Sequence, residues 1–183
     1  MREGYMNRFL SDESIALHSD YVRIKRLKYS IIESSVPRLK GAKIKDIYRM
    51  RIAPYDKRDA LDLLSEIALH ELFFTSFSKA PYPASQTVRS AYGSEANFLN
   101  TIYKRATSLP YGFILVYSLQ GRVEIRECTD FKSAYYRSEP VLALDVCEHV
   151  YFSDYGFDKE RYLSESLPYL DLTRLTDSPH VNG

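Results

Sequence analysis

The sequence predicts an α+β fold in which helices come first and a short antiparallel sheet with helices packed on it follows. Residues 11–33 and 55–78 carry apolar side chains at the three- and four-residue spacing of helices. After Pro110 the apolar pattern changes to that of strands. A proline-containing stretch, residues 79–83, separates the two parts. We therefore expect an N-terminal helical domain at residues 1–80 and a C-terminal α/β domain at residues 81–183.

The first helix should begin at Ser11, whose side chain can cap a helix, and end near Glu33. His18 shares a face with Ile15 and Val22, which indicates that it points inward. A single inward histidine is more often a core residue with satisfied hydrogen bonds than a metal ligand. The pattern alone therefore does not assign His18 a function.

The second helix should run from about Tyr55 to Ser78, with Asp56 as its cap. His70 lies beside the apolar stripe of this helix. The short connection between the two helices favours an antiparallel hairpin. In that arrangement His70 and His18 could lie level with each other.

The C-terminal part has the pattern of strands joined to short helices. From it we expect a helical stretch over residues 84–106 with a possible break at 92–94, strands at 111–117 and 122–126 joined by a tight turn at 119–121, a third strand at 141–146, and a last helix from Asp158 to about Leu170. The second strand alternates apolar and charged residues, as a strand with one solvated face does.

The composition is that of an ordinary globular protein of 183 residues. A net charge of +1 argues against a nucleic-acid partner, and the apolar runs are too short to span a membrane. The N-terminus shows no secretory signal, and the isolated Cys128 and Cys147 form no CxxC motif, so we expect a cytoplasmic protein. The basic residues 37–55 are expected to form a solvated connection with a short helix, with an anion-binding patch as the alternative.

Asp145 and His149 form half of a candidate metal site. Asp145 sits where the third strand should end, and the residues after it have a helical pattern. A spacing of four on a helix places Asp145 and His149 on one face. Carboxylates and imidazoles are common metal ligands. His18 and His70 are candidates for the other half, and the remaining histidine, His180, lies in a polar tail.

Four stretches resemble segments of the iron/manganese superoxide dismutases. Residues 145–151, D-V-C-E-H-V-Y, resemble the family signature D-x-W-E-H-x-Y. Residues 10–18 and residues 70–74 (H-E-L-F-F) resemble the segments that carry the first and second histidine ligands. Residues 92–98, Y-G-S-E-A-N-F, resemble F-G-S-x-x-x-F. Each match is short, but the four occur in the family's order and extend over nearly the whole chain.

The resemblance implies that His18, His70, Asp145 and His149 bind one iron or manganese ion per chain. It implies a helical hairpin packed on an α/β layer with a three-stranded antiparallel sheet. It also implies conversion of superoxide to oxygen and hydrogen peroxide, and a homodimer in which Glu148 pairs with His149 of the other subunit. Imidazole and carboxylate ligands suit these metals and contain no thiolate that superoxide could oxidise.

The substrate entrance departs from the family pattern. Val22 and Arg26 stand where the family usually has a histidine and a tyrosine, and Phe152 replaces another tyrosine. Arg26, or Lys25 beside it, could help to attract the anionic substrate. We therefore include Arg26 among the expected catalytic residues.

The surroundings of the metal also differ from the family. The family's tryptophans are absent, and their approximate places are taken by Phe74, Gly112, Ile114 and Cys147. The glutamine that bonds the water at the metal is missing as well. Glu66 stands near one of its two possible places, and Asp130 or Thr129 stands near the other. We expect Glu66 and Asp130 to be the catalytic replacements, with consequences for the metal's reduction potential.

Three functions fit these observations. The first is an iron- or manganese-dependent superoxide dismutase. The second is a catalytically weak, dismutase-like metal-binding protein with a structural or interaction role, because the entrance residues are replaced. The third is another enzyme at the same centre, for instance a hydrolase, since zinc also accepts three histidines and a carboxylate.

Overall fold

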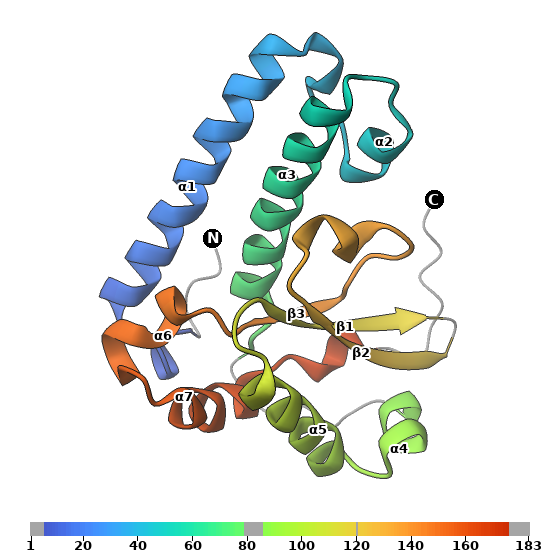
Figure 1. Cartoon of the computed structure of the whole chain (residues 1–183). Helices are drawn as coiled ribbons and strands as arrows, with labels where there is room; N and C mark the ends of the chain where they lie inside the picture. The colour runs from blue at the N-terminus through green and yellow to red at the C-terminus, as the bar shows by residue number, and fades with distance from the viewer. Residues whose placement is uncertain (1–5, 79–85, 120, 176–183) are drawn as a thin grey trace.

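Two long helices, α1 (Asp12–Ser35) and α3 (Pro54–Thr75), form an antiparallel hairpin that packs on an α/β layer (Figure 1). A short helix, α2 (Ile44–Arg49), lies in their connection, as expected for that basic stretch. The predicted α+β fold and its hairpin are therefore confirmed. This computed structural model describes residues 6–78, 86–119 and 121–175. The expected domain boundary near residue 80 and His180 lie outside the described residues.

The ends of the hairpin helices follow from local chemistry. The Ser11 side chain accepts a hydrogen bond from the backbone three residues on, at 3.1 Å, which confirms the predicted cap of α1. The expected cap of α3, Asp56, is wrong, because the helix begins at Pro54 and Asp56 lies in its first turn. α3 also ends earlier than predicted. The Ser78 backbone amide donates to the Tyr169 carbonyl, at 2.8 Å, instead of continuing the helix.

The sheet has three antiparallel strands in the order β2-β1-β3. β1 covers Phe113–Leu119, β2 Arg122–Cys128 and β3 Leu142–Asp145. In the central strand Phe113 pairs with Cys128 on one side and with Asp145 on the other. β2 alternates buried and exposed positions, as predicted for a strand with one solvated face. The register places Asp145 at the end of its strand, close to the hairpin.

Four helices complete the α/β layer: α4 (Gln86–Tyr92), α5 (Glu95–Ser108), α6 (Glu148–Tyr155) and α7 (Lys159–Ser166). The predicted break between α4 and α5 is confirmed at Gly93, and Ser94 caps α5. α7 is shorter than predicted, because Leu167 begins a 3-10 turn that contains a proline. Tyr162 of α7 is fully buried, and its hydroxyl donates to the Asp145 carbonyl at 2.9 Å. α7 thereby supports the end of β3.

The main core joins the two layers. It contains the sheet, the inner faces of α5 and α7, and Leu69 and Phe73 of α3. A smaller cluster under the hairpin connection includes Leu39 and Ile47. Because α3 contributes to the main core, the hairpin is fixed against the sheet by apolar contacts as well as by polar ones. Within the described residues, no helix has the length and apolar character needed to cross a bilayer.

Candidate metal centre

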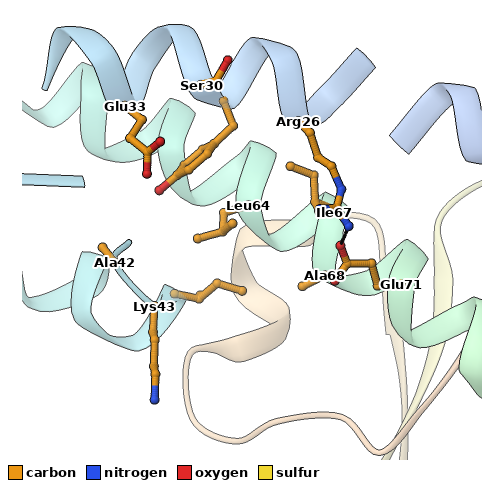
Figure 2. Close-up of a pocket in the computed structure, with 11 residues that line it drawn as sticks. Arg26, Ser30, Glu33, Ala42, Lys43, Leu64, Ile67, Ala68 and Glu71 are labelled. Carbon is orange, nitrogen blue, oxygen red and sulfur yellow. Dashed lines mark hydrogen bonds and ion pairs between the residues drawn. The ribbon is translucent and has the colours of Figure 1, made fainter. Parts of the chain in front are cut away.

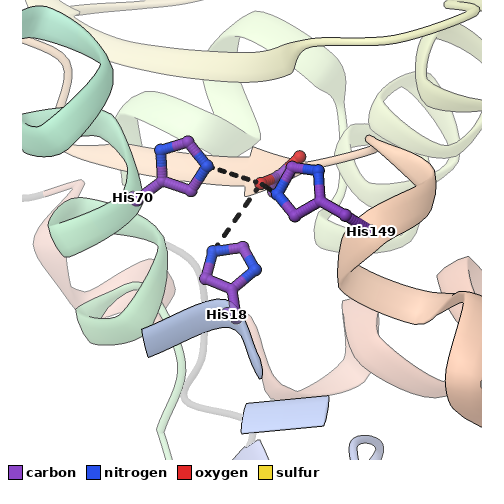
Figure 3. Close-up of side chains that lie close together, drawn as sticks. His18, His70 and His149 are labelled. Carbon is purple, nitrogen blue, oxygen red and sulfur yellow. Dashed lines mark ion pairs between the residues drawn. The ribbon is translucent and has the colours of Figure 1, made fainter. Parts of the chain in front are cut away.

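Four side chains from four different elements meet where the hairpin packs on the sheet. His18 comes from α1, His70 from α3, Asp145 from the end of β3 and His149 from α6. One potential ligand atom of each lies within 4.8 Å of the others. Figure 3 shows the three imidazoles around the carboxylate. The structure thus brings together the four residues that the resemblance singled out as metal ligands.

The spacing of these atoms suits a shared metal ion. Asp145 Oδ2 lies 3.8 Å from His18 Nε2, 3.5 Å from His70 Nε2 and 3.6 Å from His149 Nε2. Nitrogen and oxygen ligands bind a transition metal at about 2.0–2.2 Å, so two ligands of one ion lie about 3–4 Å apart. The three separations fall in that range. They are too long for hydrogen bonds.

The polar atoms of this cluster lack the partners that burial demands. Among the described residues, His18 Nε2, His70 Nε2 and Asp145 Oδ2 are buried without a hydrogen-bond partner. Burial, with the neighbouring histidines, lowers the pKa of His18 from 6.5 to about 2, so this imidazole is neutral. Its contact with Asp145 is therefore no ion pair. Buried groups left without partners are costly, and a cation bound between them would satisfy all three.

Asp145 is the last residue of β3, which confirms the strand end predicted there. The expected helix face shared with His149 is wrong, because α6 begins only at Glu148. The Cys147 backbone amide donates to Asp145 Oδ1 at 2.8 Å, which leaves Oδ2 facing the imidazoles. α6 then begins at Glu148, and its first turn carries His149 back over the carboxylate.

His70 is held in one tautomer by its own helix. Its Nδ1 lies 2.7 Å from the Glu66 backbone carbonyl, which can only accept a hydrogen bond. Nδ1 therefore carries the proton, and Nε2 presents its lone pair to the cluster. A second hydrogen bond that fixes the tautomer of an imidazole is typical of metal-binding histidines.

Glu66 also organises a polar network beside the cluster. Its carboxylate accepts a hydrogen bond from the Tyr21 hydroxyl at 2.6 Å and pairs with Lys25 Nζ at 2.8 Å. The Tyr21 ring stacks on His149, with centroids 4.6 Å apart, and lies 5.2 Å from the His70 ring. Burial and the bond to Glu66 raise the pKa of Tyr21. Sequence reasoning missed Tyr21 as a site residue, although its position three residues after His18 puts it near the same helix face.

Two expected catalytic residues have other partners. The Arg26 guanidinium reaches from α1 to Glu71 of α3, at the edge of a hollow of about 490 Å³ between the hairpin helices (Figure 2). The exposed Asp130 carboxylate pairs with Lys132 at 2.7 Å and lines a separate hollow. Asp130 lies beyond the end of β2. Within the part of the chain that the structure describes, its carboxylate forms no hydrogen bond or ion pair with the four-residue cluster. Of the three expected catalytic residues, Glu66 is the one connected to the cluster. Its backbone carbonyl bonds His70, and its carboxylate bonds the Tyr21 hydroxyl, whose ring stacks on His149.

The cluster opens toward the surface at His149. The side chain of His149 is 33% exposed, whereas those of His18, His70 and Asp145 are at most 1% exposed. Cys147, next to it, is half-buried, and the Gly112 amide donates to its Sγ at 3.2 Å. Burial, together with the Asp145 charge, raises the pKa of the Cys147 thiol. A neutral thiol held in this way leaves the cluster with nitrogen and oxygen ligands.

The fold and this cluster define an α+β protein with a candidate site for a single metal ion. A family model described as iron/manganese superoxide dismutases, C-terminal domain, matches residues 81–177, which is more than half of the chain. The chain therefore belongs to the iron/manganese superoxide dismutase family. It is similar to manganese superoxide dismutase 1 of Halobacterium salinarum, with 29% identity over 116 residues, 60% of this chain. The match spans 58% of that relative's length.

Proposed function

We propose that this protein is an iron- or manganese-dependent superoxide dismutase, which converts superoxide to oxygen and hydrogen peroxide. The observation that carries the proposal is the set of buried, unpartnered ligand atoms around Asp145 Oδ2 in a chain of this family. A structural core histidine would be hydrogen-bonded instead. The relative from Halobacterium salinarum, a manganese superoxide dismutase by name, supports the same activity.

His18, His70, Asp145 and His149 are the proposed ligands of one iron or manganese ion per chain. When bound, the metal supplies a centre that can take one electron and give one back, which the dismutation of two superoxide ions requires. The protein's part is to hold three imidazoles and one carboxylate together in a largely buried pocket. The donor set contains no thiolate, which suits a centre that meets superoxide and peroxide.

The polar network beside the ligands controls the approach to the site. Tyr21 covers His149 and His70 with its ring, and Glu66 holds the Tyr21 hydroxyl in place. Lys25, whose side chain is 20% exposed, is a candidate for attracting an anion such as superoxide, although Glu66 pairs with it at 2.8 Å. Arg26 is the second candidate for this attraction, although Glu71 balances its charge. Asp130 has no role in the proposal.

We propose a homodimer that joins two such sites. Glu148 is exposed at the start of α6, next to the partly exposed His149, so both can meet a second subunit. A pair formed by Glu148 with His149 of another copy would cover the open side of the cluster.

The two cysteines form no disulfide within the described residues, which supports a reducing, cytoplasmic location.

We also propose the division into domains at residues 1–80 and 81–183. The C-terminal family model begins its match at residue 81, and the helical hairpin lies before that point. The hairpin supplies His18 and His70, and the second part supplies Asp145 and His149. Each part therefore provides half of the proposed ligand set, and neither half would hold the metal alone.

The proposed activity can be tested with protein reconstituted separately with iron, manganese and zinc. Superoxide decay should be followed by stopped-flow absorbance with each metal, with His149→Ala as the control variant. We expect one of the two redox-active metals to give catalytic decay that the control loses. Decay no faster than with the free ion, for both iron and manganese, would contradict the proposal.

A second candidate function is a dismutase-like protein that binds metal without efficient turnover. The altered entrance favours it: Val22 is buried, Arg26 is tied to Glu71, and Phe152 is 48% exposed. In the same experiment, tight binding of iron or manganese without catalytic decay would support this function. Stable binding of zinc alone would instead favour metal-assisted hydrolysis.

A further inference from the structure

The connection between the two hairpin helices concentrates positive charge. Residues 37–55 contain six lysines and arginines and one aspartate, a net charge of +5, whereas the rest of the chain has a net charge of −4. All six basic side chains are exposed: Arg38, Lys40, Lys43, Lys45, Arg49 and Arg51. The chain-wide charge of +1 therefore conceals a local basic surface, here called the basic connection, at one end of the hairpin (Figure 1).

Most cations of the basic connection have no acidic partner. Four of them form no ion pair within the described part of the chain: Lys40, Lys43, Arg49 and Arg51. The Arg38 guanidinium donates to the backbone carbonyl of Arg51 at 3.0 Å, a contact that leaves its charge uncompensated. Lys45 pairs with Glu139 at 2.8 Å. A surface of uncompensated cations attracts a chain of anions, such as the phosphates of a nucleic acid.

A hollow with two tyrosine rings borders the basic connection. It has a volume of about 600 Å³ and is the hollow that Asp130 lines, with Tyr48 of α2 and Tyr136 in its wall. The two rings meet edge to face with centroids 5.4 Å apart, and Tyr136 is 67% exposed. The Tyr48 hydroxyl donates to the Lys132 carbonyl, which fixes its ring. An exposed ring beside a hollow can stack on a nucleobase.

The carboxylates of the hollow already have cations of their own. Arg126 donates two hydrogen bonds of 2.7 Å to Glu124, and Lys132 pairs with Asp130 at 2.7 Å. Arg137, which is exposed and lines the same hollow, has no ion-pair partner among the described residues. The hollow therefore keeps one positive charge for a ligand.

The geometry of α2 places a further cation beside the hollow. At about 100° per residue, Lys45, Tyr48 and Arg49 fall within an arc of about 100°. Lys45 and Tyr48 contact Glu139 and Tyr136 of the segment after β2, so this arc faces the hollow. Arg49 therefore lies on the same side of α2. The cations of the basic connection and the tyrosine rings form one continuous surface.

We propose that the basic connection and the hollow beside it bind single-stranded nucleic acid. Arg49 and Arg137 contact phosphates, and the Tyr136 ring stacks on a base. The net charge of +1 is no obstacle, because a strand meets only the local charge. A duplex fits less well, since its bases are not free to stack on a side chain. A lipid surface also fits less well, because the rings line a hollow instead of protruding. The site uses none of the four proposed metal ligands and is independent of the proposed function.

Fluorescence anisotropy with a labelled oligothymidylate of about 20 nucleotides tests this site. We expect binding that weakens as salt rises, with a logarithmic slope of about −0.7 for each phosphate contacted. Arg49→Glu should weaken binding at low salt by at least about tenfold and make the slope shallower. Arg89→Glu is the matched control, because Arg89 is exposed on α4, far from α2 (Figure 1), and the net charge changes equally. No binding by the wild type at low salt, or an equal loss in both variants, would overturn the proposal.

Substitution of Tyr136 tests the stacking separately from the charge. Tyr136→Ala should weaken binding by at least about fivefold and leave the salt slope unchanged, because it removes a ring and no cation. Tyr136→Phe keeps the ring and should bind as the wild type does. If Tyr136→Ala binds as tightly as the wild type, the proposed site is wrong. Flotation with vesicles of phosphatidylserine and phosphatidylcholine completes the test: a wild type that binds vesicles but no oligonucleotide would contradict a nucleic-acid site. Unchanged metal content and circular dichroism show that each variant is folded.

Discussion

His70 Nε2 of the helical hairpin lies 3.5 Å from Asp145 Oδ2 of the sheet, and among the described residues neither atom has a hydrogen-bond partner. The two groups belong to different layers of the fold. A cation between them would therefore join the hairpin to the α/β layer, so metal binding and stability should be coupled.

Glu66 should stabilise the protein through two separate contacts. Glu66→Gln keeps an acceptor for the Tyr21 hydroxyl but loses the charge that pairs with Lys25, and should cost about 1 kcal/mol. Glu66→Ala leaves both partners unsatisfied and should cost about 2–4 kcal/mol. Urea denaturation measures both variants. Equal stabilities for the two would show that the contact with Tyr21 contributes nothing.

The metal-free protein should lose stability as the pH falls below about 6.5. His18 has a pKa of about 2 in the fold against 6.5 when unfolded, so the unfolded chain binds the proton first. The contribution of the neutral His18 side chain to the free energy of unfolding is complete above pH 6.5. It decreases on acidification, by about 2 kcal/mol at pH 5. Burial lowers the pKa of His149 too, which adds to the same trend.

Urea denaturation of the metal-free protein from pH 8 to pH 5 measures this dependence. His18→Gln is the control, because it removes the titrating group and should reduce the slope. A free energy of unfolding that stays constant over this range in the wild type would contradict the burial of a neutral His18.

Gly112→Ala should be among the most destabilising small substitutions in the chain. Gly112 has a φ of +111°, and a Cβ there would lie 2.2 Å from the Cys128 carbonyl oxygen. Both the conformation and the contact exclude a side chain, so we expect a loss of more than about 2 kcal/mol. Gly41→Ala is the control, since its φ is +68° but no atom lies within 4 Å, and it should cost about 1 kcal/mol. Thermal unfolding of both variants tests whether Gly112→Ala lowers the stability more than Gly41→Ala does.

Glu148→Ala should weaken the proposed dimer. The residue is exposed in the single chain, so its removal should leave the fold intact and remove the proposed pair with His149 of the second copy. Analytical ultracentrifugation of this variant measures the association constant at low and high salt. An unaltered constant would remove Glu148 from the contact.

The elements of the fold could be predicted because their signals are local. The cap at Ser11, the break at Gly93 and the alternation of β2 each depend on residues that are neighbours in sequence. The early end of α7 follows from a proline that is local in the sequence, although the prediction extended the helix past it. The exact end of α3 could not be predicted, because it depends on a distant contact. Ser78, for instance, pairs with Tyr169, which is far along the chain. Propensity alone does not reveal such a partner.

The site was predictable in its residue types but not in all of its geometry. Three of the short motifs carry the residues of the cluster, and the strand end expected at Asp145 is confirmed, yet the shared helix face expected for Asp145 and His149 is wrong because α6 begins only at Glu148. Asp130 was a candidate from its place in the sequence, but the turn after β2 directs it toward Lys132. The sequence did not identify Tyr21 as a site residue, because its ring reaches His149 only through the packing of α1 against α6. These features arise from tertiary packing, which a pattern in one segment does not contain.

The metal content of the purified protein tests the central claim most directly. Elemental analysis of the wild type and of His70→Ala should be combined with thermal unfolding before and after chelation. We predict about one iron or manganese ion per chain in the wild type, lost in the variant, with a fall in melting temperature that chelation reproduces in the wild type alone. Metal content that is unchanged in His70→Ala would contradict the proposed site.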